Sequence, residues 1–159
     1  MKVIFLDFDG VLNSSVFITE ARKWRQKNQE KHRSVEWWAS DIDPKAVALL
    51  NFILSKTEAQ IVISSSWRYG CSLDLLRSIL KASGCEGEVI AVTPRMPGNH
   101  RSDKIQEWLR LHPEVDSFVV LDDARDAGID GKFVQTDYGI GLTQEDAEKA
   151  VEILNDSKG

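Results

Sequence analysis

Two acidic residues interrupt an apolar stretch near the start of the chain, in the segment VIFLDFDGVLN at residues 3–13. Asp7 and Asp9 stand one residue apart, and Gly10 follows at once. One carboxylate can attack and accept a phosphoryl group, and a second beside it can supply and remove protons. The pair therefore predicts phosphoryl-transfer chemistry, if other groups neutralise its charge and hold a phosphate.

A second acidic pair, Asp122-Asp123, follows another apolar stretch, FVVL. Several carboxylates at one site repel each other unless a cation neutralises them. Ligands that are all oxygen atoms suit a hard ion such as Mg²⁺. If Asp7, Asp9, Asp122 and Asp123 meet in the fold, they predict a magnesium site.

Three further segments carry groups that bind phosphate. Ser64 and Ser65 begin a serine run that follows a third apolar stretch, and their hydroxyls can bind phosphate oxygens. Arg101 and Lys104 stand at the expected start of a helix, where anions are already favoured. Either of them could hold the transferring group. Arg68 could reach a phosphate of the substrate or pair with a surface carboxylate.

The elements that must position these groups alternate between strands and helices. Apolar, β-branched stretches predict strands, and capping residues with periodic apolar positions predict helices. The expected strands are 2–7, 59–63, 88–92, 117–121 and 132–135, and the expected helices are 43–57, 73–83, 103–111 and one capped by Thr143. Such alternation predicts an α/β fold with a parallel sheet of about five strands flanked by helices. The polar clusters all fall at the carboxyl ends of strands, where such sheets bind ligands.

Residues 14–42 break this rhythm, because residues 43–57 already suffice for the crossover to the second strand. We interpret them as a small basic insertion over the strand ends. Residues 21–33 hold six Lys or Arg against one Glu, a local charge of +5 in a chain of −5. With Trp24, Trp37 and Trp38, this segment could bind nucleic acid, or it could be a solvated helix face whose tryptophans pack on the sheet.

The bulk properties set broad bounds. A length of 159 residues favours a single domain, 1–159, with 14–42 inserted in it. The two cysteines, Cys71 and Cys85, have no metal-like spacing, which fits a reducing compartment. The apolar start is too short for a signal peptide, and no stretch is long enough to span a membrane. We therefore expect a cytoplasmic protein without a membrane partner.

The motifs together resemble the haloacid dehalogenase (HAD) superfamily, over almost the whole chain. DFDGVLN resembles its first motif, IVISS its second, the Arg101 or Lys104 region its basic third, and FVVLDD its acidic fourth. The stretches SSSWR, RSDKIQEWL, and LDD followed by TDYGIGLT further resemble the small HAD domains of Swiss Army Knife RNA repair proteins. Those domains are related to the 3′-phosphatase half of polynucleotide kinase-phosphatases.

This resemblance implies a Rossmann-like fold and a Mg²⁺-dependent phosphohydrolase. By position, Asp7 would be the nucleophile that becomes aspartyl-phosphate, and Asp9 the general acid and base. Mg²⁺ would be held by Asp7, the main-chain carbonyl of Asp9 and Asp122, with Asp123 as a second acidic partner. Ser64 would bind the phosphoryl group. The basic third motif is usually lysine, and here Arg101 lies where that residue tends to fall, while Lys104 competes with it.

The substrate class stays open between a phosphomonoester at a nucleic-acid 3′ end and a small phosphorylated metabolite. About 29 residues are too few for an independent cap domain, so the cap-like insertion leaves room for a polymer end. A different class is a phosphoryl-accepting module similar to a response-regulator receiver. Receivers place their acidic pair on the first strand and the accepting aspartate on the third, whereas here a pair lies on the fourth and Asp9 adjoins the nucleophile. A catalytically inactive binding protein with this fold is not supported, because none of the core acidic residues is missing.

Overall fold

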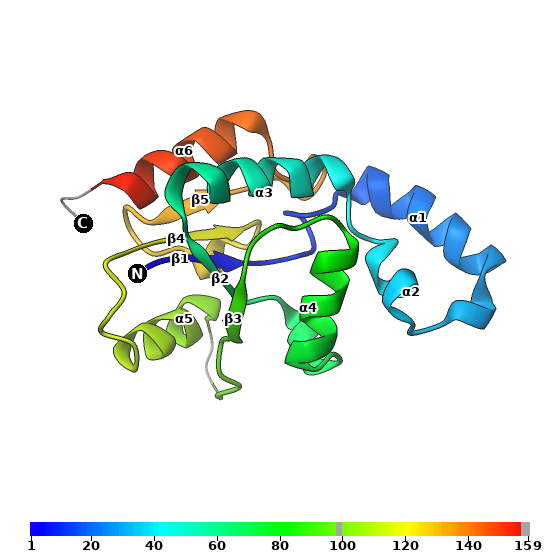
Figure 1. The fold of residues 1–159 in the computed structure, drawn as a ribbon, viewed down its shortest axis with the longest axis horizontal. Coiled ribbons are helices and arrows are strands. Elements are labelled where there is room, and N and C mark those ends of the chain that lie inside the picture. Colours follow the sequence, from blue (N-terminus) through cyan, green and yellow to red (C-terminus); the bar gives the residue numbers. More distant parts are fainter. Residues whose placement is uncertain (98–99, 157–159) are drawn as a thin grey trace.

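The computed structural model describes residues 1–97 and 100–156. Its centre is a parallel sheet of five strands in the order β3-β2-β1-β4-β5 (Figure 1). The strands are β1 (Lys2–Leu6), β2 (Gln60–Ile63), β3 (Val89–Val92), β4 (Ser117–Asp122) and β5 (Phe133–Gln135). The helices are α1 (Ser15–Lys27), α2 (Val35–Ala39), α3 (Pro44–Thr57), α4 (Leu73–Ala82), α5 (Arg101–Arg110) and α6 (Gln144–Asn155). The predicted α/β fold and parallel sheet are confirmed.

Capping interactions set the helix boundaries. The Asp43 side chain accepts a hydrogen bond from the Lys45 N–H at 2.9 Å and starts α3, as the sequence predicts. Helix α5 begins at Arg101, two residues before the predicted start at 103, so that boundary was wrong. The reason is local, because the N–H of His100 donates to the Asp103 carboxylate at 3.3 Å. Asp103 therefore caps the helix from within its first turn and is not the residue at which the helix starts.

Alternate residues of each strand face the two layers of helices. Ile4 and Leu6 of β1 belong to a core formed with α3, α4 and α6. Val3 and Phe5 belong to a smaller core on the other side, which includes Trp108 of α5. Figure 1 shows α3 and α6 side by side across the sheet from α5. Both faces of the sheet are thus covered, as a parallel sheet requires.

Strand β1 lies in the middle of the sheet, where the strand order reverses. It pairs with β2 on one side and with β4 on the other, and Leu6 stands opposite both Ile63 and Leu121. The next residues along the three strands are Asp7, Ser64 and Asp122. The register therefore brings one polar residue from each strand to the point where open α/β sheets bind ligands.

The segment 14–42 folds into α1, a short 3-10 turn (Gln29–Lys31) and α2, beyond the carboxyl ends of the strands (Figure 1). Its charge is smaller than the run 21–33 suggests, because 14–42 holds four acidic residues against six basic ones, a net +2. Arg22 and Arg25 both pair with the buried Asp41, at 3.2 and 3.1 Å. The segment is thus a folded, internally paired element at the site, and a cap-like function for it stays a prediction.

None of the helices in the described part of the chain is both long and apolar enough to cross a membrane.

Candidate active site

Three carboxylates converge at the end of the central strands. Oxygen atoms of Asp7, Asp122 and Asp123 lie within 4.8 Å of one another. Asp7 and Asp122 are buried, with 4% and 0% of their surface exposed, whereas Asp123 is half-buried. The Asp7 N–H donates to the Leu121 carbonyl at 3.0 Å, which ties the start of this loop to β4. The structure thus brings together three of the four acidic residues singled out in the sequence.

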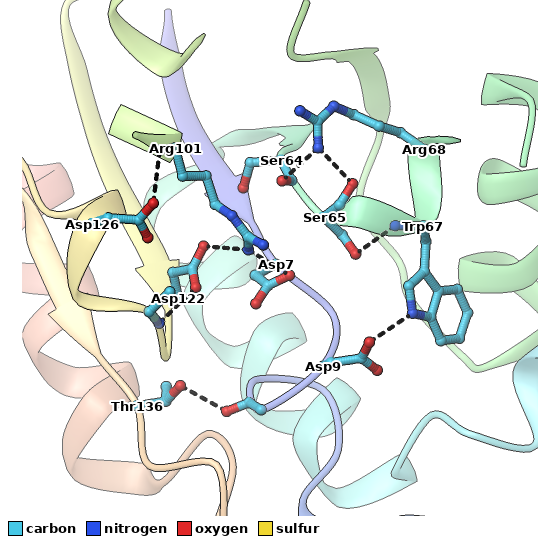
Figure 2. Close-up of polar contacts among 12 residues, drawn as sticks. Asp7, Asp9, Ser64, Ser65, Trp67, Arg68, Arg101, Asp122, Asp126 and Thr136 are labelled. Carbon is cyan, nitrogen blue, oxygen red and sulfur yellow. Dashed lines mark hydrogen bonds and ion pairs between the residues drawn. The ribbon is translucent and has the colours of Figure 1, made fainter. Parts of the chain in front are cut away.

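Arg101 bridges two of these carboxylates from the start of α5. Its Nη1 lies 3.1 Å from Asp7 Oδ1 and 2.9 Å from Asp122 Oδ2 (Figure 2). The backbone N–H of Arg101 donates to the Asp126 carboxylate at 3.2 Å, which fixes the end of the helix. One guanidinium therefore partly neutralises two buried acids, and it stands beside the carboxylate expected to react.

The cluster perturbs its own ionisation. Burial, followed by the charge of Asp122, raises the pKa of Asp7 to about 8, against the opposing effect of Arg101. Burial also raises the pKa of Asp122. For Arg101 burial alone would lower the pKa, but the charges of Asp7 and Asp122 outweigh it and raise the pKa. Without further positive charge, the site therefore holds a proton on Asp7 at neutral pH.

A row of hydroxyl groups continues from Asp7 across the sheet. Ser64 follows β2 and Thr93 follows β3, and both are buried. The Oγ of Ser64 and the Oγ1 of Thr93 have no hydrogen-bond partner among the described residues. Buried hydroxyls are normally paired, so these two keep unused hydrogen-bonding capacity at the carboxyl ends of β2 and β3. Thr93 was missed by the sequence analysis, although its place at the end of an expected strand could have marked it.

Gly10 makes room for Asp123. Gly10 has a φ of +83°, and a Cβ at this position would lie 2.6 Å from Asp123 Cγ. Its carbonyl accepts a 2.6 Å hydrogen bond from the Thr136 hydroxyl. The loop after β1 is thereby fixed against the far strands, so the glycine is needed both for its conformation and for close approach.

Asp9 is turned away from the acidic cluster. Its Oδ2 accepts a hydrogen bond from the Trp67 indole N–H at 3.1 Å (Figure 2). Its Oδ1 accepts one from the Asn13 amide at 3.1 Å. The Asn13 amide also donates to the Asp41 carbonyl, and the Asn13 side-chain oxygen accepts from the Gly10 N–H. Asn13 and Trp67 were not predicted as site residues, since nothing in their local sequence shows which carboxylate they reach.

The remaining candidates lie around the serine run. The Ser65 hydroxyl oxygen accepts from the Trp67 N–H at 3.2 Å and caps the turn Ser66–Tyr69. Arg68 is buried, and its guanidinium donates to the carbonyls of Ser64, Ser65 and Thr93. These donors hold the loop together, so neither a substrate phosphate nor a surface carboxylate is needed to explain Arg68. Its predicted contact with phosphate stays a prediction.

Lys104 does not reach the carboxylates. Its Nζ donates to the Tyr69 hydroxyl at 3.2 Å, and the same hydroxyl accepts from Arg68 at 2.9 Å. Arg101, one helical turn earlier, makes the two contacts with the acidic cluster. Of the two basic candidates from the sequence, the structure places Arg101 against the expected nucleophile.

The donor set fits a magnesium ion. Asp7, Asp122 and Asp123 offer only carboxylate oxygens, within a few ångströms of one another, which a hard divalent ion prefers. Burial and the neighbouring Asp122 raise the pKa of Asp7, and a bound divalent ion would oppose both effects by favouring the ionised carboxylate. The Asp9 carboxylate is not part of this group, and its role through the main-chain carbonyl stays a prediction.

Comparisons with known proteins agree with the motifs. A comparison with protein-family models matched residues 3–147 to a family described as the HAD domain in Swiss Army Knife RNA repair proteins. The match covers β1 from Val3 onward and the other four strands in full, and it contains every candidate site residue. Comparisons with curated proteins and with solved structures returned no match.

Proposed function

Because this chain belongs to the family of HAD domains found in Swiss Army Knife RNA repair proteins, we propose that it is a Mg²⁺-dependent phosphohydrolase. It would cleave phosphomonoesters through an aspartyl-phosphate on Asp7. HAD-type hydrolase activity follows at the level of the family. The observation that supports the specific site most is the cluster of Asp7, Asp122 and Asp123 beside Arg101. The buried Ser64 hydroxyl next to it has no hydrogen-bond partner among the described residues.

In the proposed reaction, Asp7 attacks the phosphorus with a carboxylate oxygen, and the bond from phosphorus to the leaving oxygen breaks. Asp9 gives its proton to that leaving oxygen. Asp9 then takes a proton from water as the water attacks phosphorus, which frees Asp7 and releases inorganic phosphate. Arg101 and Ser64 donate to the phosphoryl oxygens where negative charge gathers.

Asp7, Asp122 and Asp123 would hold the magnesium ion. When bound, the ion neutralises the carboxylates and the phosphoryl oxygens, which keeps Asp7 ionised and lets it approach the phosphate. Asn13 and Trp67 orient Asp9 through one hydrogen bond to each of its oxygens.

The substrate class we propose is a phosphomonoester at a nucleic-acid 3′ end. The description of the family supports it, and so does the size of the insertion 14–42, which is too small for an independent cap domain that would enclose a small molecule. A small phosphorylated metabolite is the alternative. A screen with 3′-phosphorylated RNA and DNA oligonucleotides beside small phosphate esters tests both. Turnover of esters only would contradict the nucleic-acid substrate, and a stable phosphoprotein without turnover would contradict the hydrolase.

Replacing Asp9 should separate the two chemical steps. With Asp9→Asn, we expect kcat for an alkyl phosphate to fall about 10²–10⁴-fold, because no acid protonates the leaving oxygen. p-Nitrophenol leaves as a stable anion, so p-nitrophenyl phosphate should still give a rapid first release of about one equivalent, followed by slow turnover. Rapid-quench kinetics measures this burst. Equal losses for both esters, without a burst, would contradict the role of Asp9 as the acid.

Arg101 and Lys104 should differ in their effect on turnover. Arg101→Ala removes the only contact of these two cations with Asp7 in the structure, and we expect kcat to fall about 10²-fold or more. Arg101→Lys should recover part of this loss. Lys104→Ala should cost far less, since Lys104 contacts Tyr69. Steady-state kinetics on one ester decides, and a larger loss for Lys104→Ala would reverse the assignment.

A further inference from the structure

A pocket opens on the side of Asp9 that faces away from Asp7. It lies between the end of β2 and the helices α1 and α2, and its volume is about 810 Å³. Sites for small molecules usually measure about 300–1,000 Å³. Asp9 lines the pocket, and the proposed reaction places the leaving group on the Asp9 side of the phosphate. The pocket is therefore positioned to hold the part of the substrate that leaves.

One wall of the pocket is aromatic. Trp67, Trp38 and Trp37 follow one another along it, with ring centroids 5.2 Å apart for the first pair and 4.9 Å for the second. All three rings are only half-buried. Because the Trp67 indole N–H is bonded to Asp9, the aromatic wall starts at the proposed acid. The rings do not share a plane, because Trp38 is tilted by 88° to Trp37 and by 53° to Trp67. A flat ring can therefore stack on one half-exposed tryptophan face at a time.

The same wall is held rigidly and remains polar. The Arg25 guanidinium lies 3.6 Å from the centre of the Trp37 ring and pairs with Asp41 at 3.1 Å. Among the described residues, Arg25 Nη2, Trp38 Nε1 and Asp41 Oδ1 are buried and have no hydrogen-bond partner. Arg25 is 8% exposed and Asp41 2%. Buried polar atoms are normally paired, so these residues of the pocket keep hydrogen-bonding capacity that the chain does not use.

The rim carries amides, and its charges cancel. The exposed side chains of Gln26 and Gln29 line the pocket and form no hydrogen bond with described residues. Arg22 and Arg25 are offset by Asp41 and Asp9, which also line it. Because the positive and negative side chains of the pocket balance, the pocket does not favour an extended polyanion. Amides that donate and accept suit the edge of a heterocycle or the hydroxyls of a sugar.

We propose that this pocket binds one nucleoside, the leaving group of a nucleoside phosphate, with its base stacked on the tryptophan wall and its sugar beside Asp9. This inference rests on the proposed phosphohydrolase function and narrows its substrate. The nucleoside could be the last residue of an RNA strand or part of a free nucleotide, since both present the same base, sugar and phosphate.

Binding tests the pocket without turnover. In the Asp7→Asn protein, uridine 3′-monophosphate should quench tryptophan emission saturably, and glycerol 2-phosphate should not, because only the nucleotide has a ring to stack. Adding Trp37→Leu should weaken binding of the nucleotide at least about fivefold, since a stacking contact with the base is lost. Equal affinity for the two phosphates, or no effect of Trp37→Leu, would overturn the proposal.

Kinetics gives a second test that does not alter the aromatic wall. The double variant Gln26→Ala and Gln29→Ala changes two exposed side chains, so it should fold. We expect the ratio of kcat/KM for uridine 3′-monophosphate over glycerol 2-phosphate to fall at least fivefold. Gln144→Ala, the same change in α6, lines no part of this pocket and should leave the ratio as it is. An unchanged ratio in the double variant would overturn the role of the rim.

The outcomes separate the pocket from the reaction. If glycerol 2-phosphate and the nucleotide are hydrolysed equally well, the pocket proposal fails and the hydrolase stands. If the nucleotide binds but neither ester is cleaved with Mg²⁺, the proposed hydrolase fails and the pocket stands. A uridine-terminated, 3′-phosphorylated tetranucleotide distinguishes the sources: higher kcat/KM than for the mononucleotide identifies a strand end, and lower kcat/KM identifies a free nucleotide.

Discussion

Asp7→Asn should lower phosphatase turnover by at least about a thousandfold, because an amide cannot attack phosphorus as the carboxylate does. The loss should appear in kcat for every phosphomonoester, whichever leaving group it carries, since formation of the aspartyl-phosphate precedes all later steps. Stopped assays on one alkyl ester and on p-nitrophenyl phosphate measure it. More than about a tenth of wild-type turnover with either ester would contradict the assignment of the nucleophile.

The fold of this variant should survive, so the loss can be read as chemical. Burial raises the pKa of Asp7 to about 8, so without metal the group is already neutral at pH 7 and asparagine replaces it with similar shape. Asp74→Asn is the matched control, because it makes the same chemical change on an exposed side chain of α4. We expect wild-type turnover from the control, and cooperative unfolding from both variants.

The positions of the acidic cluster could be predicted from the sequence because each rests on a strong local rule. β-Branched stretches that end in Asp7, Ser64 and Asp122 are typical of parallel strands, and the carboxyl ends of such strands share one edge. The helix that starts at Arg101 follows another strand to the same edge. Pattern and topology alone therefore bring these groups together, and the structure confirms the sheet that does so.

The environment of Asp9 could not be predicted, because it depends on contacts between distant segments. Trp67 lies 58 positions away and donates to Asp9 only because β2 lies next to β1. Likewise, the charge of 21–33 suggested an open basic surface, yet the buried Asp41 pairs with two of its arginines from outside that run. The sequence shows where charged residues stand along the chain, but which of them form ion pairs depends on how the segment 14–42 folds.

Magnesium should stabilise the folded protein, and increasingly so at higher pH. Without metal, folded Asp7 keeps its proton to about pH 8, whereas the unfolded chain loses it near the ordinary value of 3.8. Between these values, raising the pH favours unfolding, by at most about 1.4 kcal/mol per pH unit for this group. A bound cation favours the ionised carboxylate. The rise in Tm produced by Mg²⁺ should therefore be larger at pH 8 than at pH 5.5.

Asp122→Asn should remove most of the rise in Tm that Mg²⁺ produces and most of the Mg²⁺-dependent turnover. It takes one carboxylate from the group of three whose oxygens lie within 4.8 Å, so the rise in Tm with Mg²⁺ should largely disappear and turnover should fall about 10²-fold or more. Without metal, the variant should be at least as stable as the wild type at pH 8, because a buried charge beside Asp7 is gone.

In the wild type, excess chelator should abolish turnover and added Mg²⁺ should restore it, with Asp74→Asn behaving as the wild type throughout. Full turnover in excess chelator would contradict the magnesium-dependent mechanism, while a Tm shift that persists in Asp122→Asn would place the ion elsewhere.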